Sequence, residues 1–572
     1  MRRRTFFQCV LAPLLGLNLA AQEVSQSGLE LKAARAMVSQ PERARHAMVA
    51  TVHELATQVG VEVLRKGGNA VDAAVAVGFA LAVVHPEAGN LGGGGYMLVR
   101  MADGRTAAID YRETAPKAAK HELYKDPSEY RVGYKSAAVP GTVAGLAMAH
   151  KMFGSRSWKE VLEPSRRLAA KGFPASYRME LILGLQVPVM SKFPETAKVF
   201  LHGKNQPLKQ GEQVLQPDLA KTIARMQKHG WREFYEGETA RLIAADMKAN
   251  GGFITLDDLK NYQAMLREPL KGSYRGVQLL TMPPSTSGGI TVLQILNILE
   301  RFPIKIGMEG SSEVRHLQIE AMRRAYRDRL RYAGDPDHVE IPVAKIISKA
   351  YAKTLAASIN LQRATPSKAL GAEAVAWRLG EPDEQESAET THFSIIDAAG
   401  NVVTNTYTLN GFYGSQVIPK GTGVLLNDIM SAFSHDARSK NVVAPGKRPL
   451  SSMAPTIVLR PDNTPLLALG SPGSQTIPNS ILNVITNVVD YKMSLRDAIQ
   501  FPRIHHQFEP DRIEAEPAAL VLDVQERLKA MGHTIYSRWR SQGDIHAVMI
   551  EDRTGMRLGW SDGRRGGKAF GY

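Results

Sequence analysis

Two adjacent threonines lie directly before a predicted β-hairpin and could supply a nucleophile. Residues 389–394 read ETTHFS, and they follow a polar, acidic segment at 380–388. Threonine is a weak nucleophile unless a base lies beside it, and an N-terminal threonine can use its own α-amine as that base. Such an amine has a pKa of about 7.7–8.0. Cleavage between Glu389 and Thr390 would create this nucleophile, although the pair could equally well just open a strand.

A glycine-rich turn is a candidate for stabilising negative charge. Residues 470–474 read GSPGS and lie between a predicted strand that ends at Leu469 and a helix that starts near Ile477. Successive backbone N–H groups at such a turn can form a nest for an oxyanion. The motif is also common in ordinary loops, so alone it does not define a site.

Arg112 follows a predicted strand and could bind a carboxylate. It lies in the stretch at 109–116, which reads IDYRETAP. A guanidinium at a strand end can form two parallel hydrogen bonds with a carboxylate. The alternative is an ordinary ion pair with the neighbouring Glu113.

Motifs that suggest cofactors or metals do not fit their usual patterns. The glycine run at 92–95 lacks the spacing of nucleotide-binding loops, which favours close backbone packing beside a site. The His-Glu pair at 53–54 lacks the second histidine of a zinc protease motif, and the serines at 451–452 lack a nucleophile elbow. The adjacent histidines at 505–506 would point in opposite directions on a strand. We therefore expect no metal and no cofactor.

The elements that must position these residues indicate an α+β fold. Helices are expected at 51–65 and 70–84, the second alanine-rich and apolar like a buried helix. Alternating runs at 393–397 and 402–410 predict the hairpin. Separate groups of strands and helices favour layers over a doubly wound parallel sheet. Further helices are expected near 142–153, 158–171, 217–229, 238–249, 288–299, 311–332, 477–490, 494–500 and 519–531, and further strands near 96–100, 106–111, 455–460, 465–469, 512–515 and 545–551.

Composition and length limit the class of protein. The chain has 572 residues, 44% hydrophobic and 22% charged, which suits a globular protein with a sizeable core. The formal charge is +15, and the Lys and Arg residues are scattered, which suits anionic substrates or surfaces better than nucleic acid. The only cysteine, Cys9, lies in a predicted leader, so a mature chain would contain no disulfide or catalytic thiol.

The N-terminus predicts export. A basic MRRR start, an apolar stretch at 6–19 and small residues at 19–21 indicate that residues 1–21 are a signal peptide. The RRTFF sequence at 3–7 also resembles a twin-arginine signal, so a Sec or twin-arginine route would lead to the periplasm or to secretion. The apolar part is too short for a stable membrane span. Residues 22–45 are expected to form a polar lead-in.

A series of short motifs occurs in order along nearly all of the predicted mature chain. They are GGNAVDAA at 67–74, HPEAGNLGGGG at 85–95, YRE at 111–113, PGTVAG at 140–145, MPP at 282–284, SGG at 287–289, TTH at 390–392, TYTLN at 406–410, PLSSM at 449–453 and GSPG at 470–473. Together they resemble the γ-glutamyltransferase (glutathione hydrolase) family of N-terminal nucleophile hydrolases. The histidines at 505–506 also fit this family, which favours a structural role for them.

The resemblance implies a four-layer αββα sandwich and autocatalytic cleavage before Thr390. The products would be a large subunit at 22–389 and a small subunit at 390–572, held together as a heterodimer. Thr390 would first attack the Glu389–Thr390 bond. It would then accept the γ-glutamyl group of glutathione or a related amide and pass it to water or an amino acid.

The resemblance also assigns roles within the site. Thr408 would orient the Thr390 hydroxyl, and the N–H groups of Gly473 and Ser474 would hold the tetrahedral oxyanion. The implied substrate-binding residues are Arg112, Ser451 and Ser452 for the α-carboxylate of the donor and Asn410 for its α-amine.

Three departures from the family pattern concern the pocket. Members usually carry Glu or Gln and Asp to bind the donor ammonium, whereas this chain has Ile429 and Ala432, which cannot accept a hydrogen bond. The nearby Asp428 is displaced by one residue, which on a strand would turn it to the other face. Ser474 replaces a usual glycine but keeps its N–H. The segment at 434–448 is shorter than in members with a lid loop, so the site would be open to larger acceptors.

These departures leave two other functions open beside standard γ-glutamyl chemistry. One is an acylase for donors without the α-amine, such as the glutaryl-type amides used by cephalosporin acylases similar to this family. The other is a homologue that is processed but catalytically weak.

Overall fold

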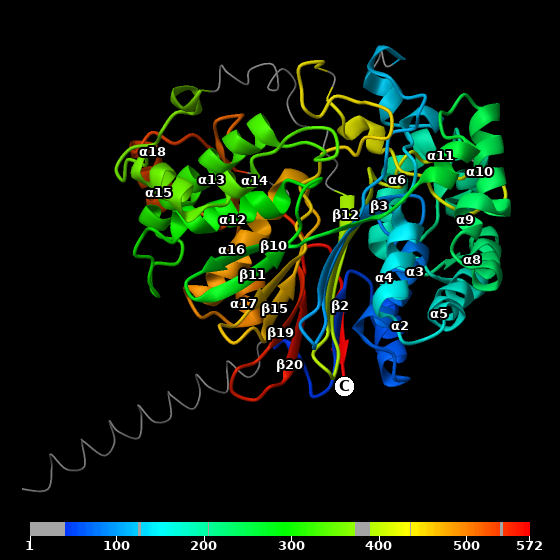
Figure 1. Cartoon of the computed structure of the whole chain (residues 1–572), viewed down its shortest axis with the longest axis horizontal. Coiled ribbons are helices and arrows are strands. Elements are labelled where there is room, and N and C mark those ends of the chain that lie inside the picture. The colour runs from blue at the N-terminus through cyan, green and yellow to red at the C-terminus, as the bar shows by residue number, and fades with distance from the viewer. Residues whose placement is uncertain (1–39, 124–126, 204, 372–388, 435, 538–540) are drawn as a thin grey trace, which may run out of the picture. The chain divides into compact units, whose positions relative to one another are not determined.

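Two antiparallel seven-stranded sheets face each other in the computed structural model, and helices cover the outer face of each sheet. Figure 1 shows the resulting four layers, which confirm the predicted αββα sandwich. The structure describes residues 40–123, 127–203, 205–371, 389–434, 436–537 and 541–572. The predicted signal peptide at 1–21 and the segment at 372–388 lie outside the described residues.

The first sheet has the predicted hairpin at its centre. Alternate residues of β13 (Val402–Asn410) face opposite sides, as the pleat of a strand requires. Val403 and Tyr407 pack in the core beneath the helices, whereas Thr404 donates a hydrogen bond to the Leu469 carbonyl of the second sheet. Residues of even number, including Thr408, therefore face the space between the sheets. The strand order is β21 (Lys568–Gly571), β2 (Met48–Thr51), β12 (Glu389–Ile396), β13, β3 (Gly94–Arg100), β4 (Thr106–Tyr111) and β9 (Met265–Arg267).

The second sheet supplies the opposite wall of the site. Its central strand β15 (Pro465–Leu469) runs directly into the glycine-rich turn at 470–474. The strand order is β1 (Glu42–Ala44), β20 (Arg557–Ser561), β19 (His546–Ile550), β15, β14 (Thr456–Leu459), β11 (Val277–Thr281) and β10 (Leu270–Tyr274). A small third sheet contains β16 (Ile504–His505), β17 (Ile513–Ala515) and β18 (Ile535–Ser537).

The helix α3 (Ala70–Val84) is buried along its whole length, as its alanine-rich sequence predicts. Asn69 and Asp72 form a capping box at its start. The helices on the side of the first sheet are α2 (Glu54–Arg65), α3, α4 (Thr142–Phe153), α5 (Trp158–Lys171), α6 (Tyr177–Met190), α8 (Pro217–His229), α10 (Glu238–Ala249) and α11 (Leu256–Asn261). Those on the side of the second sheet are α12 (Gly288–Leu299), α13 (Ser312–Tyr332), α15 (Lys349–Ala357), α16 (Ile477–Val489), α17 (Leu495–Gln500) and α18 (Leu522–Ala530).

Helix positions were easier to predict than edge strands. The helices predicted at 70–84, 142–153 and 158–171 match α3, α4 and α5 at both ends. The strands β10, β11, β20 and β21 were missed. β10 reads LKGSY, in which Lys and Gly obscure strand alternation, and its pairing with β11 supplies the missing stabilisation. The expected lead-in at 22–45 contains β1, which joins the edge of the second sheet.

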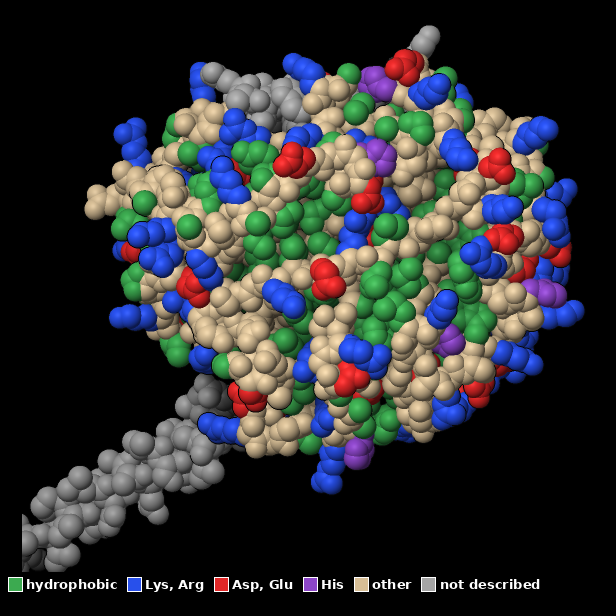
Figure 2. All heavy atoms as spheres, in the orientation of Figure 1, with side chains coloured by type: hydrophobic (Ala, Val, Ile, Leu, Met, Phe, Trp, Pro, Cys, Tyr) green, Lys and Arg blue, Asp and Glu red, His purple; other side chains and the backbone are tan. Residues whose placement is uncertain are grey.

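The surface agrees with the predicted scatter of charge. Figure 2 shows Lys and Arg side chains spread over the visible face, with Asp and Glu among them. Within the described ranges, no helix is both long and apolar enough to cross a membrane.

Candidate active site

Thr390 lies beside Thr408 on the paired strands β12 and β13. The register of the pair shifts between Glu389 and Thr391, which sets Thr390 at an irregular position. The Thr390 Oγ1 donates a hydrogen bond to Thr408 Oγ1 at 3.3 Å. The Thr408 hydroxyl in turn donates to the Glu389 carbonyl oxygen at 2.5 Å. One hydroxyl thus contacts both the candidate nucleophile and the carbonyl of the peptide bond before it.

A small pocket of about 30 Å³ brings the predicted residues together around this pair. Its walls come from both sheets and from the loops that follow β4 and precede β14. Among the predicted site residues, only Glu389 and Gly473 do not line it. The lining residues are Arg112, Thr390, Thr408, Asn410, Ala432, Leu450, Ser451, Ser452, Met453, Ser474 and Ile477.

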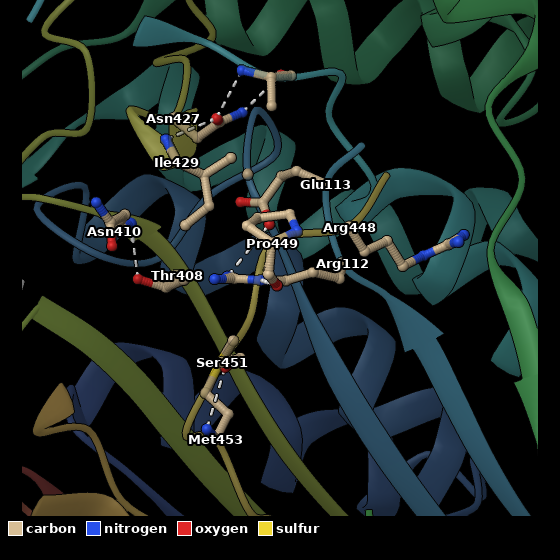
Figure 3. A network of polar contacts seen from close by, with 12 residues as sticks. Arg112, Glu113, Thr408, Asn410, Asn427, Ile429, Arg448, Pro449, Ser451 and Met453 are labelled. Atoms are coloured by element: carbon tan, nitrogen blue, oxygen red, sulfur yellow. Dashed lines mark hydrogen bonds and ion pairs between the residues drawn. The ribbon is translucent and has the colours of Figure 1, made fainter. Parts of the chain in front are cut away.

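Arg112 is buried and held by backbone carbonyls. Its Nε donates to the Pro449 carbonyl at 3.4 Å, and its Nη2 donates to the Leu450 carbonyl at 3.3 Å (Figure 3). The Nη1 pairs with Glu113 Oε2 at 3.3 Å, so the expected alternative of an ion pair also holds. Burial raises the pKa of Glu113 despite the neighbouring guanidinium. The arginine is therefore fixed at the pocket wall and only loosely neutralised.

The adjacent serines are anchored by the backbone and by an arginine that sequence reasoning missed. Ser451 Oγ accepts a hydrogen bond from the Met453 N–H at 3.1 Å. Ser452 Oγ accepts one from Arg329 Nη2 at 3.0 Å. Arg329 lies near the end of α13, and no local pattern in that helix connects it with the serines.

The turn at 470–474 places two successive residues in the left-handed region, with φ of 130° at Gly473 and 56° at Ser474. A Cβ at Gly473 would lie 2.6 Å from Thr476 Oγ1, so the position requires glycine. For Ser474 the left-handed conformation costs about 1–2 kcal/mol. This backbone suits the predicted oxyanion nest.

His392 lies directly against this turn, a contact that the sequence does not reveal. A Cβ at Gly470 would lie 2.3 Å from the His392 ring. The ring nitrogens lie 2.8 Å from Thr406 Oγ1 and 2.9 Å from Ser394 Oγ. Burial lowers the pKa of His392 well below its usual range, so the ring is neutral. A neutral, fully packed ring thus joins the nucleophile strand to the glycine turn.

The amine side of the pocket contains no hydrogen-bond acceptor at the two positions that depart from the family. Ile429 is buried in an apolar cluster with Ala138, and Figure 3 shows its side chain near Glu113. Ala432 lines the pocket. Asn410 does face the pocket, and its Nδ2 donates to Ser431 Oγ at 2.9 Å.

Asp428 lies closer to the site than predicted. It precedes the short 3₁₀ helix Ile429–Ala432 rather than lying in a strand, so the expectation that it turns to the other face was wrong. Its Oδ1 accepts a hydrogen bond from the Gly411 N–H at 2.7 Å, beside Asn410. Burial raises the pKa of Asp428 to about 7.

The glycine run at 92–95 packs against the nucleophile hairpin. A Cβ at Gly93 would lie 2.1 Å from the Thr408 carbonyl oxygen, and one at Gly95 would lie 2.5 Å from that of Thr406. The predicted role in close backbone packing beside the site is therefore confirmed.

The histidines at 505–506 make separate structural contacts. His505 Nδ1 lies 2.5 Å from Asn479 Nδ2, and His506 Nε2 lies 3.3 Å from Asp511 Oδ1. Their partners differ, which agrees with the structural role expected for the pair.

One cluster among the described residues has the composition of a metal site. His316, Glu320 and His533 are buried and close enough to share an ion. However, the two histidines already lie 2.8 Å apart, and the Glu320 carboxylate pairs with Arg324 at 2.6 Å. The neighbouring guanidinium opposes a cation there, so the cluster is better explained by its own hydrogen bonds.

Comparison with known proteins agrees with this geometry. The family model described as gamma-glutamyltranspeptidase matches residues 56–572. The glutathione hydrolase proenzyme of Escherichia coli strain K12 is 40% identical over 529 residues, which cover 90% of this chain and 90% of that protein. The Acylase ACY 1 proenzyme of Pseudomonas sp. strain V22 is 37% identical over 521 residues, which cover 89% and 90%. The crystal structure of cephalosporin acylase from Bacillus halodurans has a TM-score of 0.83 at 26% identity and covers 93% of this chain and 97% of that chain.

A four-layer sandwich with a threonine near the start of a central strand defines an N-terminal nucleophile hydrolase. Within that class, the chain belongs to the gamma-glutamyltranspeptidase family.

Proposed function

We propose that this chain is a γ-glutamyltransferase (glutathione hydrolase) that cleaves itself before Thr390. It would transfer a γ-glutamyl group from glutathione or a related amide to water or an amino acid. The observation that carries this proposal is one pocket containing Thr390, Thr408 and the buried Arg112. Subunits at 22–389 and 390–572 would stay associated, because each sheet contains strands from both.

The proposed chemistry passes through an acyl-threonine. After cleavage, the α-amine of Thr390 accepts the proton of its own hydroxyl, and the Oγ attacks the donor amide carbon. The N–H groups of Gly473 and Ser474 hold the oxyanion, and Thr408 orients the nucleophile. The α-amine returns the proton to the leaving amine as the ester forms. Water or an amino acid then attacks the ester and regenerates the threonine.

Donor recognition in this proposal depends mainly on charge. Arg112, with Ser451 and Ser452, binds the α-carboxylate, since a guanidinium held by fixed carbonyls is preorganised for two parallel hydrogen bonds. Asn410 offers its side-chain oxygen to the α-amine. The second charge needed by the ammonium has no partner at Ile429 or Ala432.

That shortage favours a second candidate function, an acylase for donors without the α-amine. A glutaryl amide carries the carboxylate for Arg112 but no ammonium, so it leaves no unpaired buried charge beside Ala432. The relative named Acylase ACY 1 proenzyme and the cephalosporin acylase structure belong to proteins similar to this chain.

Steady-state kinetics on a γ-glutamyl anilide and a matched glutaryl anilide test both candidates. γ-Glutamyltransferase activity predicts the larger kcat/KM for the γ-glutamyl donor and loss of both activities in Thr390→Ala. A larger kcat/KM for the glutaryl donor would replace the first candidate with the second. Turnover of neither donor by fully cleaved protein would contradict both and leave the catalytically weak homologue.

We also propose that the enzyme is exported. The basic start and the apolar stretch at 6–19 support this, since they match a removable signal. The intact mass of protein purified from the periplasm or medium should correspond to a large subunit that starts after Ala21. A large subunit that retains Met1–Ala21 would contradict the proposed cleavage.

A further inference from the structure

The residue before the predicted cleavage site carries a buried charge that the catalytic scheme does not use. Glu389 is 5% exposed and begins β12. Its Oε2 lies 3.1 Å from Arg565 Nη1 and 3.3 Å from Arg178 Nη2. A single carboxylate thus accepts hydrogen bonds from two guanidinium groups.

The two arginines come from distant parts of the chain. Arg178 lies in the first turn of α6, on the large-subunit side of the predicted cut. Arg565 lies in the connection between β20 and β21, on the small-subunit side. The contacts therefore tie Glu389 to both future subunits.

Each arginine is itself held in place. Arg178 Nε lies 3.5 Å from Glu87 Oε1. Although burial alone raises the pKa of Glu87, the charges of His85 and Arg178 lower it to about 2, so this carboxylate is ionised. An ionised, buried partner fixes the Arg178 side chain from the other side.

Arg565 is linked to the glycine turn. Its backbone N–H donates to Asp544 Oδ1 at 3.1 Å. The backbone N–H of Asp544 donates to Ser471 Oγ at 2.9 Å, within the turn at 470–474. The position of the Glu389 side chain is therefore coupled to the proposed oxyanion nest.

The backbone of the same residue is held at its carbonyl. The Thr408 hydroxyl donates to the Glu389 oxygen at 2.5 Å, and Thr390 Oγ1 lies 3.3 Å from the Thr408 oxygen. Cleavage requires Thr390 Oγ to approach the Glu389 carbonyl carbon, and attack rates depend steeply on such geometry.

We infer that Arg178 and Arg565 are positioning residues for cleavage of the Glu389–Thr390 bond, and that they act by clamping the Glu389 carboxylate. This inference rests on the proposed self-cleavage and adds its structural requirement. Thr390 Oγ bonds to the Glu389 carbonyl carbon, its proton passes to the Thr390 nitrogen, and the C–N bond breaks to give an ester. One water then hydrolyses the ester, which frees the Glu389 carboxylate and the Thr390 hydroxyl and amine.

The test follows cleavage of the full chain after cell-free translation, with the fraction cut measured on denaturing gels over time. Arg178→Met and Arg565→Met should each slow cleavage about 10- to 100-fold, the range expected when reacting atoms are misplaced. Glu389→Gln, which keeps the shape but removes the charge, should slow it similarly. Arg565→Lys should recover part of the rate.

A matched control separates the clamp from general loss of an ion pair. Arg166 pairs with Glu163 at 2.7 Å on α5, and both side chains are about as exposed as that of Arg178. Arg166→Met should cleave at the wild-type rate. Thermal unfolding of Arg178→Met and Arg565→Met in the uncleaved Thr390→Ala background should match that of Thr390→Ala alone.

The double variant Glu389→Gln with Arg565→Met gives the sharpest readout. If the arginine acts through this carboxylate, the double variant should cleave no more slowly than Glu389→Gln alone. Wild-type rates in both arginine variants, or effects that multiply in the double variant, would overturn the clamp. A wild-type chain that stays whole would overturn the proposed function as well, so the two failures are distinct.

Discussion

The two sides of the donor pocket are built to different degrees. On the carboxylate side, Arg112 is buried, held by two backbone carbonyls and adjacent to two serine residues. On the amine side, Ile429 is packed in an apolar cluster and Ala432 presents only a methyl group. The nucleophile centre lies between them and contains all of its expected groups. The comparison teaches that chemistry and donor specificity are set by different residues here, so they can be changed separately.

The largest effect is expected on the carboxylate side. Arg112→Met should lower kcat/KM for both γ-glutamyl and glutaryl anilides, because it leaves a buried donor carboxylate unpaired. Loss of one partner of a buried ion pair costs about 3–5 kcal/mol, or roughly two to three and a half powers of ten in rate. Arg166→Met serves as the control. Equal loss on both donors supports the assignment, and activity close to wild type would remove Arg112 from donor binding.

The glycine turn should divide sharply between its two residues. Gly473→Ala should reduce kcat by about 10²–10³, since a side chain there collides with Thr476 and moves an N–H away from the oxyanion. Ser474→Gly keeps the N–H and removes left-handed strain, so kcat should change little while the thermal midpoint stays equal or rises. A large kcat loss in Ser474→Gly would instead assign a role to the serine side chain.

The amine side offers a gain of function. Ala432→Asp should raise the ratio of kcat/KM for the γ-glutamyl over the glutaryl donor by about 10- to 100-fold, because a hydrogen bond to a charged group contributes about 1.5–3 kcal/mol. Ala432→Asn is the matched neutral control and should change the ratio less. An unchanged ratio in Ala432→Asp would show that the donor amine binds elsewhere.

The smallest effect concerns stability and Asp428. Burial raises the pKa of Asp428 to about 7, so between about pH 4 and pH 7 the folded state keeps a proton that the unfolded chain has released. Stability should therefore fall as pH rises through this window. Thermal unfolding of Asp428→Asn should show a weaker fall than wild type. Parallel curves for the two proteins would contradict a neutral Asp428 at low pH.

Sequence patterns predicted the parts of this molecule that depend on local order. The buried helix α3 follows from its alanine-rich run, and the hairpin around Thr390 follows from strand alternation. Contacts between distant segments were invisible to such patterns. Arg329 reaches Ser452 from a helix more than a hundred positions earlier, and His392 packs on a glycine of another sheet.

Two local errors have physical causes. Asp428 was placed on a strand, but a short 3₁₀ helix begins after it and turns its carboxylate toward Gly411. The ion pairs of Glu389 could not be anticipated, because Arg178 and Arg565 approach it only when the two sheets have formed.

The most direct test of the account is the intact mass spectrum of purified wild-type protein beside Thr390→Ala. The account predicts two polypeptides in the wild type, the smaller beginning at Thr390 and carrying a free α-amine, and one uncut polypeptide in the variant. A wild-type chain that remains whole, or a new terminus at any other residue, would contradict Thr390 as the N-terminal nucleophile.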